Sequence, residues 1–373
     1  MHEMVGTFQP QEPPGDLENV LGTVHQTESP CGHGSVASHS VPAYDRPTGS
    51  FAHTTASDQR LHSVQTVHLP IPSAPPHSRG DCLTSSSRFL AEQTFSVGAV
   101  SLRVATTPPG DPPLVLLHGV TRRWQSFLPV VADLATRHQL FCVDLRGHGG
   151  SSRASRYHTI DYVPDIVGLL REHIRQPAVV YGHSLGSMVA AGVAAEIPEL
   201  VSALVLEDPP FETMGSRIRQ TRLHSYFSGV AGILRSGATP LELARDLAEV
   251  RMVDPVTNAV QRVSDVRDPV FLKFTGQALA QLDSRVLEPI LAGEWLHGYD
   301  WHELIPRIAA PTLVLRADPA VGGMLTQDDA VWCREHLRDG TLLDYPGVPH
   351  LIHQARPKEL ATHVLGFLAS LDQ

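Results

Sequence analysis

Residues 178–192, AVVYGHSLGSMVAAG, decide the fold of this chain. An apolar run typical of a buried strand ends at Tyr181, and a run of small and apolar residues that favours a helix follows Ser184. The turn between them, residues 182–186, has the sequence G-x-S-x-G. Its glycines avoid a Cβ where strand and helix pass close to each other. The stretch therefore predicts a serine hydroxyl held out at a strand-to-helix turn.

The composition indicates one large globular domain with additional chain. The sequence has 373 residues, of which 42% are hydrophobic and 18% charged, and its net charge is −10. A negative charge without a basic cluster argues against nucleic acid or an anionic membrane as a main partner. The four cysteines have no C-x-x-C spacing, and neither a long apolar run nor a signal-peptide pattern occurs. We therefore expect a cytoplasmic protein without stable membrane association.

The first 90 residues differ in composition from the rest. They are rich in Pro, Gly, Ser, Thr and His and show no sustained helix or strand periodicity. Such a segment buries too little apolar surface to offset its chain entropy, so we expect residues 1–90 to be a disordered N-terminal extension. Its histidines are too widely spaced for a preformed metal site.

Beyond this extension, short apolar runs alternate with helical patterns. This order predicts an α/β fold, with a mostly parallel sheet covered by helices on both faces. The alternation stops at residues 211–300, which have helical periodicity only. We expect this segment to be an all-helical cap over the strand ends. The core then consists of residues 91–210 and residues 301–373.

Four landmarks in the expected order make the chain resemble an α/β-hydrolase. They are His118-Gly119 after an apolar run, the glycine-rich loop at residues 144–151, the G-x-S-x-G turn, and His350 before the last helix. The resemblance covers about residues 92–373. It implies a helical cap between strands six and seven and catalysis by a serine, without a cofactor or a metal ion.

The resemblance assigns the nucleophile to Ser184 and the base to His350. A serine hydroxyl is a weak nucleophile until a base accepts its proton. His353 is the competing histidine, and we expect it to flank the site instead.

The acid that orients the imidazole is not decided by the sequence. The family most often places an aspartate after strand seven, at the position of Ala320 in this chain. In a subset of relatives the acid follows strand six, where this chain has Asp208. We favour Asp208 and keep Asp318 as the alternative. The remaining candidates are Glu207, Asp328 and Asp329.

The oxyanion hole needs two donors near the developing negative charge. We expect the backbone N–H of Leu185, directly after the nucleophile, and that of Val120. Arg122 and Arg123 follow closely in the sequence. A solvated loop is our main interpretation of these arginines, and contact with a substrate carboxylate is the alternative.

Together these features predict a carboxylesterase-like serine hydrolase. Ser184 would attack an ester, thioester, lactone or related carbonyl bond of a small, largely apolar substrate, and water would release the acyl-enzyme. The alternative from another class is a small-molecule binding protein on the hydrolase scaffold. Fluorophosphonate labelling of Ser184 distinguishes the two. The sequence leaves the substrate and the oligomeric state open.

Overall fold

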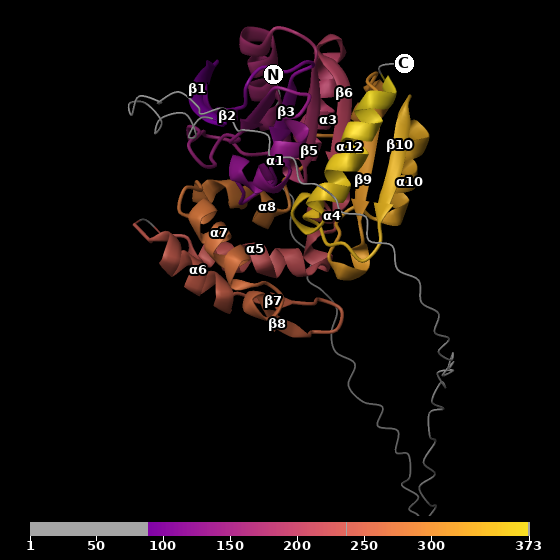
Figure 1. Cartoon of the computed structure of the whole chain (residues 1–373). Helices are drawn as coiled ribbons and strands as arrows, with labels where there is room; N and C mark the ends of the chain where they lie inside the picture. The colour runs from indigo at the N-terminus through magenta and orange to yellow at the C-terminus, as the bar shows by residue number, and fades with distance from the viewer. Residues whose placement is uncertain (1–88, 236, 372–373) are drawn as a thin grey trace, which may run out of the picture. The chain divides into compact units, whose positions relative to one another are not determined.

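The computed structural model of the chain describes residues 89–235 and 237–371 (Figure 1). The extension expected at residues 1–90 lies outside the described residues, apart from its last two. In the part of the chain described here, no helix is long and apolar enough to cross a membrane.

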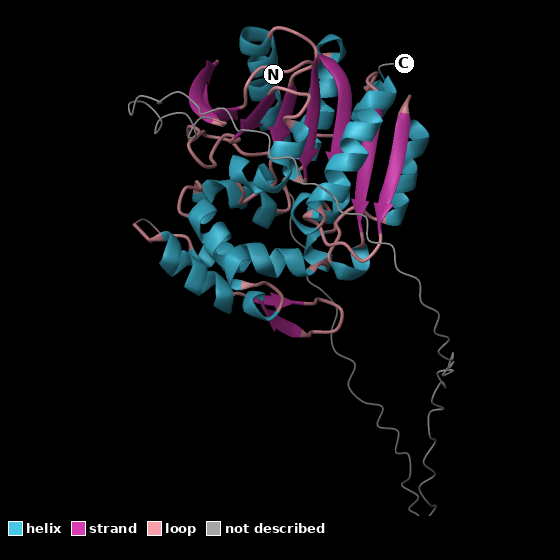
Figure 2. Ribbon diagram, in the orientation of Figure 1, coloured by secondary structure: helices cyan, strands magenta, loops and turns pink. Residues whose placement is uncertain are grey.

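An eight-stranded sheet lies at the centre of the fold, with helices on both sides (Figure 2). Its strand order is β1-β2-β4-β3-β5-β6-β9-β10. β2 pairs antiparallel with β1 and β4, and the other neighbours pair parallel. The mostly parallel sheet predicted from the sequence is confirmed. The strands are β1 (Ala91–Val97), β2 (Val100–Thr106), β3 (Leu114–Leu117), β4 (Leu140–Val143), β5 (Ala178–His183), β6 (Val201–Glu207), β9 (Thr312–Ala317) and β10 (Gly340–Tyr345).

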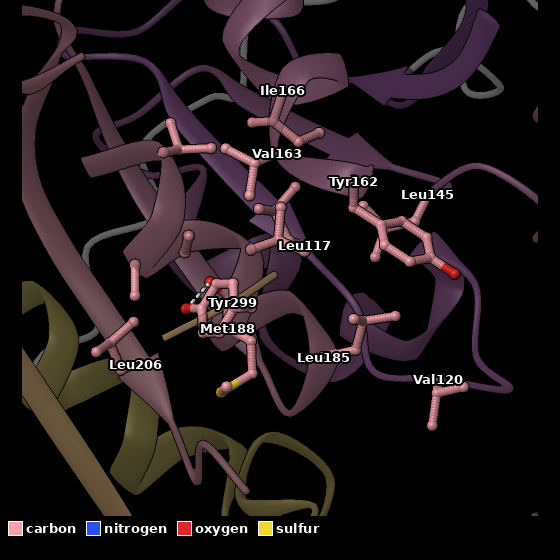
Figure 3. Close-up of a cluster of buried hydrophobic side chains, with 14 of the residues drawn as sticks. Leu117, Val120, Leu145, Tyr162, Val163, Ile166, Leu185, Met188, Leu206 and Tyr299 are labelled. Carbon is pink, nitrogen blue, oxygen red and sulfur yellow. Dashed lines mark hydrogen bonds between the residues drawn. The ribbon is translucent and has the colours of Figure 1, made fainter. Parts of the chain in front are cut away.

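Two apolar clusters pack on the two faces of the sheet, because successive side chains of a strand point to opposite faces. In β3, Val115 and Leu117 belong to one cluster, and Leu114 and Leu116 to the other. Helices α2 (Thr159–Gly168), α3 (Leu185–Glu196) and α10 (Gln327–His336) contribute to the first cluster, part of which is seen in Figure 3. Helices α1 (Leu128–Leu134), α11 (Ile352–Ala355) and α12 (Pro357–Leu371) contribute to the second.

Helix α3 explains the small residues that follow Ser184. Residues 185–195 are all buried, so no side of the helix faces solvent over this length. Tyr299, from the chain between β6 and β9, packs against this helix and donates its hydroxyl to the Met188 carbonyl at 2.6 Å (Figure 3). The inserted segment is thereby fastened to the helix that begins at the serine.

The segment between β6 and β9 lies at the end of the sheet toward which β9 and β10 run (Figure 1). Most of the segment is helical, as expected. The expectation of an all-helical cap is corrected by a hairpin of β7 (Arg251–Val253) and β8 (Val260–Arg262). Strands of three residues are too short to produce a periodic pattern in the sequence. The helices of the segment are α4 (Phe211–Met214), α5 (Arg222–Ile233), α6 (Pro240–Glu249), α7 (Pro269–Leu279), α8 (Glu288–Ala292) and α9 (Trp301–Leu304).

Candidate active site

Ser184 lies at the sharp turn between β5 and α3. Its backbone has φ 55° and ψ −116°, a conformation that costs a non-glycine residue about 1–3 kcal/mol. The turn needs glycine on both sides, since a Cβ at Gly182 would collide with the Gly186 backbone, and one at Gly186 with the Leu117 carbonyl. The Ser184 N–H donates to the Glu207 carbonyl at 3.0 Å, which ties the turn to the end of β6.

Ser184 and His350 line one cavity of about 640 Å³ between the sheet and the inserted segment. The Ser184 hydroxyl makes no hydrogen bond to any other residue that the structure describes. The cavity wall is part polar and part apolar, and its apolar members include Val120, Met214, Leu223, Tyr226, Phe227, Met252, Val263, Phe271, Val321 and Met324. A second hollow of about 690 Å³, beside Trp301, contains neither Ser184 nor His350.

His350 is held by Asp208. The imidazole Nδ1 donates to the Asp208 Oδ2 at 2.6 Å, and the Asp208 side chain is fully buried. The same carboxylate accepts backbone N–H bonds from Ala317 at 3.2 Å, Met324 at 2.8 Å and Leu325 at 3.1 Å. These donors fix the carboxylate from the side of β9. Because Nδ1 is the donor, Nε2 is the nitrogen that can accept a proton.

The other candidate acids lie elsewhere. The Asp318 carboxylate accepts the N–H groups of Ala320 and Gly347, each at 2.8 Å, and these bonds lower its pKa. Asp329 pairs with Arg217, and Asp328 is exposed. Asp208 is therefore the acid that the structure brings to His350.

Glu207 and His353 form a second, sealed pair beside the first. The Glu207 carboxylate accepts the Nδ1 and the backbone N–H of His353 at 2.9 Å, and the Tyr181 hydroxyl at 2.6 Å. The Ser126 Oγ lies 2.8 Å from His353 Nε2. Both members of the pair are fully buried. The sequence contained one signal for this pair, which is its place beside the first pair. Glu207 is adjacent to Asp208, and His353 closely follows His350.

His183 lies between the two pairs. Its ring centroid is 4.5 Å from that of His350 and 4.9 Å from that of His353. Burial lowers the pKa of His183 well below its ordinary value, and its Nε2 donates to the His350 carbonyl at 3.1 Å. Its Nδ1 has no partner among the described residues. The ligand atoms of His183, Glu207 and His353 lie within 4.8 Å, but hydrogen bonds to Glu207 and Ser126 already occupy both ring nitrogens of His353.

The loop after β3 approaches the serine closely. A Cβ added at Gly119 would lie 2.9 Å from His183 Nδ1 and 3.0 Å from Ser184 Cβ. The backbone N–H groups of Val120 and Leu185, the donors expected for an oxyanion hole, have no hydrogen-bond partner among the residues that the structure describes. They are free to bind a substrate oxygen.

The two arginines of this loop differ, and the expectation of a solvated loop is corrected for Arg122. Arg122 is only 7% exposed and lines the cavity, where it donates to the Thr275 hydroxyl at 2.7 Å. Arg123 instead donates to Gln277 and Gln281 at 2.8 and 3.1 Å. The inserted helix α7 buries Arg122, a contact that local sequence does not reveal.

Comparisons with known proteins agree with this fold. The model of the α/β-hydrolase fold family matches residues 112–353, and the chain belongs to that family. It is 32% identical to lipase LipV of Mycobacterium tuberculosis over 273 residues, which are 70% of this chain and 95% of that protein. It is 30% identical to the pimeloyl-[acyl-carrier protein] methyl ester esterase of Chromobacterium violaceum, over 64% of this chain and 87% of that one.

Two further similarities are more limited. The 2-(acetamidomethylene)succinate hydrolase of Mesorhizobium japonicum is 33% identical over 144 residues, which cover 38% of this chain and 51% of that protein. Among solved structures, the enol-lactonase of Burkholderia xenovorans superposes with a TM-score of 0.57 at 17% identity, over 74% of this chain and all of that one. The solved structure, at 17% identity, shows the fold alone. The lipase and the methyl ester esterase, together with the family match, support hydrolase activity.

Proposed function

We propose that this protein hydrolyses an ester, thioester, lactone or related carbonyl bond of a small substrate by acyl transfer, with Ser184, His350 and Asp208 as the catalytic triad. The observation that carries the proposal is the 2.6 Å bond from His350 to Asp208, at a cavity that the strained Ser184 also lines. A buried acid fixes the imidazole tautomer and stabilises the imidazolium that forms when the serine loses its proton.

The reaction follows from these positions. Ser184 Oγ attacks the carbonyl carbon while His350 Nε2 accepts its proton, and the Leu185 and Val120 N–H groups stabilise the negative oxygen, each by about 3–4 kcal/mol. His350 then protonates the leaving group, which leaves an acyl-enzyme. A water molecule attacks the acyl carbon with His350 as the base, and the acid product departs as Ser184 recovers its proton.

Within this reaction type, we propose that the protein is a carboxylesterase-like serine hydrolase. The names of two relatives, a lipase and a methyl ester esterase, support ester hydrolysis. The apolar residues of the cavity wall fit an aliphatic part of the substrate. Cys142 and Cys333 are free, buried thiols, which fits a reducing compartment, and we propose the cytoplasm.

Fluorophosphonate labelling tests the proposal. The reagent should modify Ser184 in the wild-type chain, as located by peptide mass spectrometry, and should leave the Ser184→Ala variant unlabelled. A screen of p-nitrophenyl esters of graded chain length, beside lactones and amides, then defines the bond that is cleaved.

A second candidate is a small-molecule binding protein on the same scaffold. It is favoured by one observation, that Ser184 and His350 are not hydrogen-bonded to each other in the structure. Such bonds are often long before substrate binds, so we retain the enzymatic proposal. A folded protein that resists labelling, yet binds a ligand in the cavity, would establish the binding function instead.

A further inference from the structure

The cavity above Ser184 carries an excess of positive charge. Its charged wall residues, other than histidine, are Arg122, Arg222, Arg267 and Asp254. Asp254 pairs with Arg222 at 2.9 Å. For Arg122 and Arg267, no carboxylate lies within 4.0 Å among the residues that the structure describes. Two unpaired guanidinium groups therefore face the cavity of a chain whose net charge is −10.

Arg122 is unusual because it is buried without an acid. It is the only buried arginine among the described residues, at 7% exposure, whereas the partly buried Arg146 binds Asp165 through two bonds of 2.6 Å. Leaving a buried charge unpaired is costly, so such a group is a candidate for ligand binding. In the free protein the guanidinium has the Thr275 hydroxyl and the face of the Phe271 ring, 4.6 Å from the ring centroid.

Arg267 contacts the same aromatic ring. Its guanidinium carbon lies 4.8 Å from the centroid of Phe271, so the guanidinium groups of Arg122 and Arg267 both contact this ring at the cavity. Burial, with the nearby charge of Arg267, lowers the pKa of Arg122 to about 10. The group therefore remains protonated at neutral pH. A planar guanidinium matches the two oxygens of a carboxylate better than it matches a neutral chain end.

We propose that Arg122, assisted by Arg267, binds a free carboxylate of the substrate, so that the preferred substrates are half-esters or similar mono-derivatives of dicarboxylic acids. This inference rests on the proposed function and narrows it. It replaces the expectation of a largely apolar substrate with an aliphatic chain that ends in a negative charge.

A binding experiment tests the carboxylate site without chemistry. In the Ser184→Ala protein, calorimetry should show that the monomethyl ester of succinate, glutarate or adipate binds about 10-fold or more tightly than a neutral methyl ester of equal length. Arg122→Met in the same background should abolish that difference. Equal affinities for the half-ester and the neutral ester would overturn the assignment of a carboxylate. So would inorganic phosphate that binds as tightly as the half-esters.

A kinetic experiment separates a binding role from a structural one. Arg122→Met should lower kcat/KM for a p-nitrophenyl half-ester about 10- to 100-fold more than kcat/KM for a neutral p-nitrophenyl ester. Arg267→Gln should have a smaller effect of the same kind, because its side chain is partly exposed. Arg123→Met, which removes a charge one residue away, is the matched control. An equal loss for both substrates would show that Arg122 only supports the cap.

The two experiments fail in different ways. If the protein cleaves neither ester, the proposed function is wrong, but the calorimetric comparison still reads the carboxylate site. If it cleaves neutral esters and Arg122→Met changes nothing selectively, the acyl-transfer proposal survives and the carboxylate site does not.

Discussion

Two buried histidine–carboxylate pairs, one on each side of His183, are built from neighbouring parts of the chain. Glu207 is the last residue of β6, and Asp208 follows it directly. Their histidines are close as well, since His350 lies in the loop before α11 and His353 lies in that helix. The nitrogen–oxygen distances are 2.6 Å for the first pair and 2.9 Å for the second. The second pair also has a hydroxyl, that of Ser126, 2.8 Å from its outer ring nitrogen. By hydrogen bonds alone, the second pair is the more complete triad.

The surroundings of the two pairs differ in what catalysis needs. His350 opens on the cavity, together with a serine on a strained turn and two backbone N–H groups that have no partner within residues 89–235 and 237–371. His353 is sealed on every side, and its outer nitrogen is closed off by Ser126. The comparison indicates that a candidate catalytic site needs access to a cavity and backbone N–H groups free to bind a substrate oxygen. A serine–histidine–acid arrangement alone does not define such a site, because the sealed pair only holds a loop in place.

The largest expected effect is the loss of turnover on removing the serine at the open pair. Ser184→Ala should lower kcat on the order of a millionfold, since triad members act as a unit. Ser126→Ala is the matched control, and it should keep its activity and lose about 1 kcal/mol of unfolding free energy. Esterase assays and denaturant titrations measure the two quantities. Inactivation by the Ser126 change instead would reverse the roles of the two pairs.

The acid of the open pair should have the next largest effect. Asp208→Asn should lower kcat about 10⁴-fold because the imidazole loses the partner that selects its tautomer. Asp318→Asn should leave kcat nearly unchanged, since that carboxylate binds only loop N–H groups. Steady-state kinetics of both variants decides the matter, and a loss confined to the Asp318 variant would reject the assignment.

The sealed pair should matter for stability. Glu207→Gln leaves the buried His353, Tyr181 and backbone donors without a carboxylate and should cost about 3–5 kcal/mol of unfolding free energy. The fraction that folds should still react with a fluorophosphonate at Ser184. Urea unfolding combined with labelling of the folded fraction measures both. A stable but unreactive variant would mean that Glu207 takes part in the chemistry.

The smallest effect concerns His183, which contacts both pairs. Burial keeps its folded-state pKa well below the ordinary value, whereas the unfolded chain protonates this ring below about pH 6.5. Its contribution to stability is therefore present above that pH and is lost on acidification, by about 1.4 kcal/mol per pH unit. Unfolding free energies measured across the acid range should fall less steeply for His183→Gln. The exposed His173, changed to Gln, is the control, and identical slopes for all three proteins would contradict a neutral, buried His183.

Much of the fold could be predicted because its signals are local. The alternation of apolar runs and helical patterns predicted the parallel sheet, and residues 182–186 predicted a serine at a strand-to-helix turn, which the structure shows. These features depend on periodicity and on backbone sterics within a few residues. The hairpin of β7 and β8 escaped prediction because its strands are too short to show a period.

The tertiary structure alone decided how distant side chains meet. Asp208 and His350 are 142 residues apart in the sequence, and Arg122 and Thr275 are 153 apart. The sequence could therefore favour Asp208 among several acids without deciding between them, and it could not show that helix α7 buries Arg122. Periodicity and turn chemistry specify each segment by itself, but the distance between two side chains depends on how the whole sheet and the inserted helices pack together.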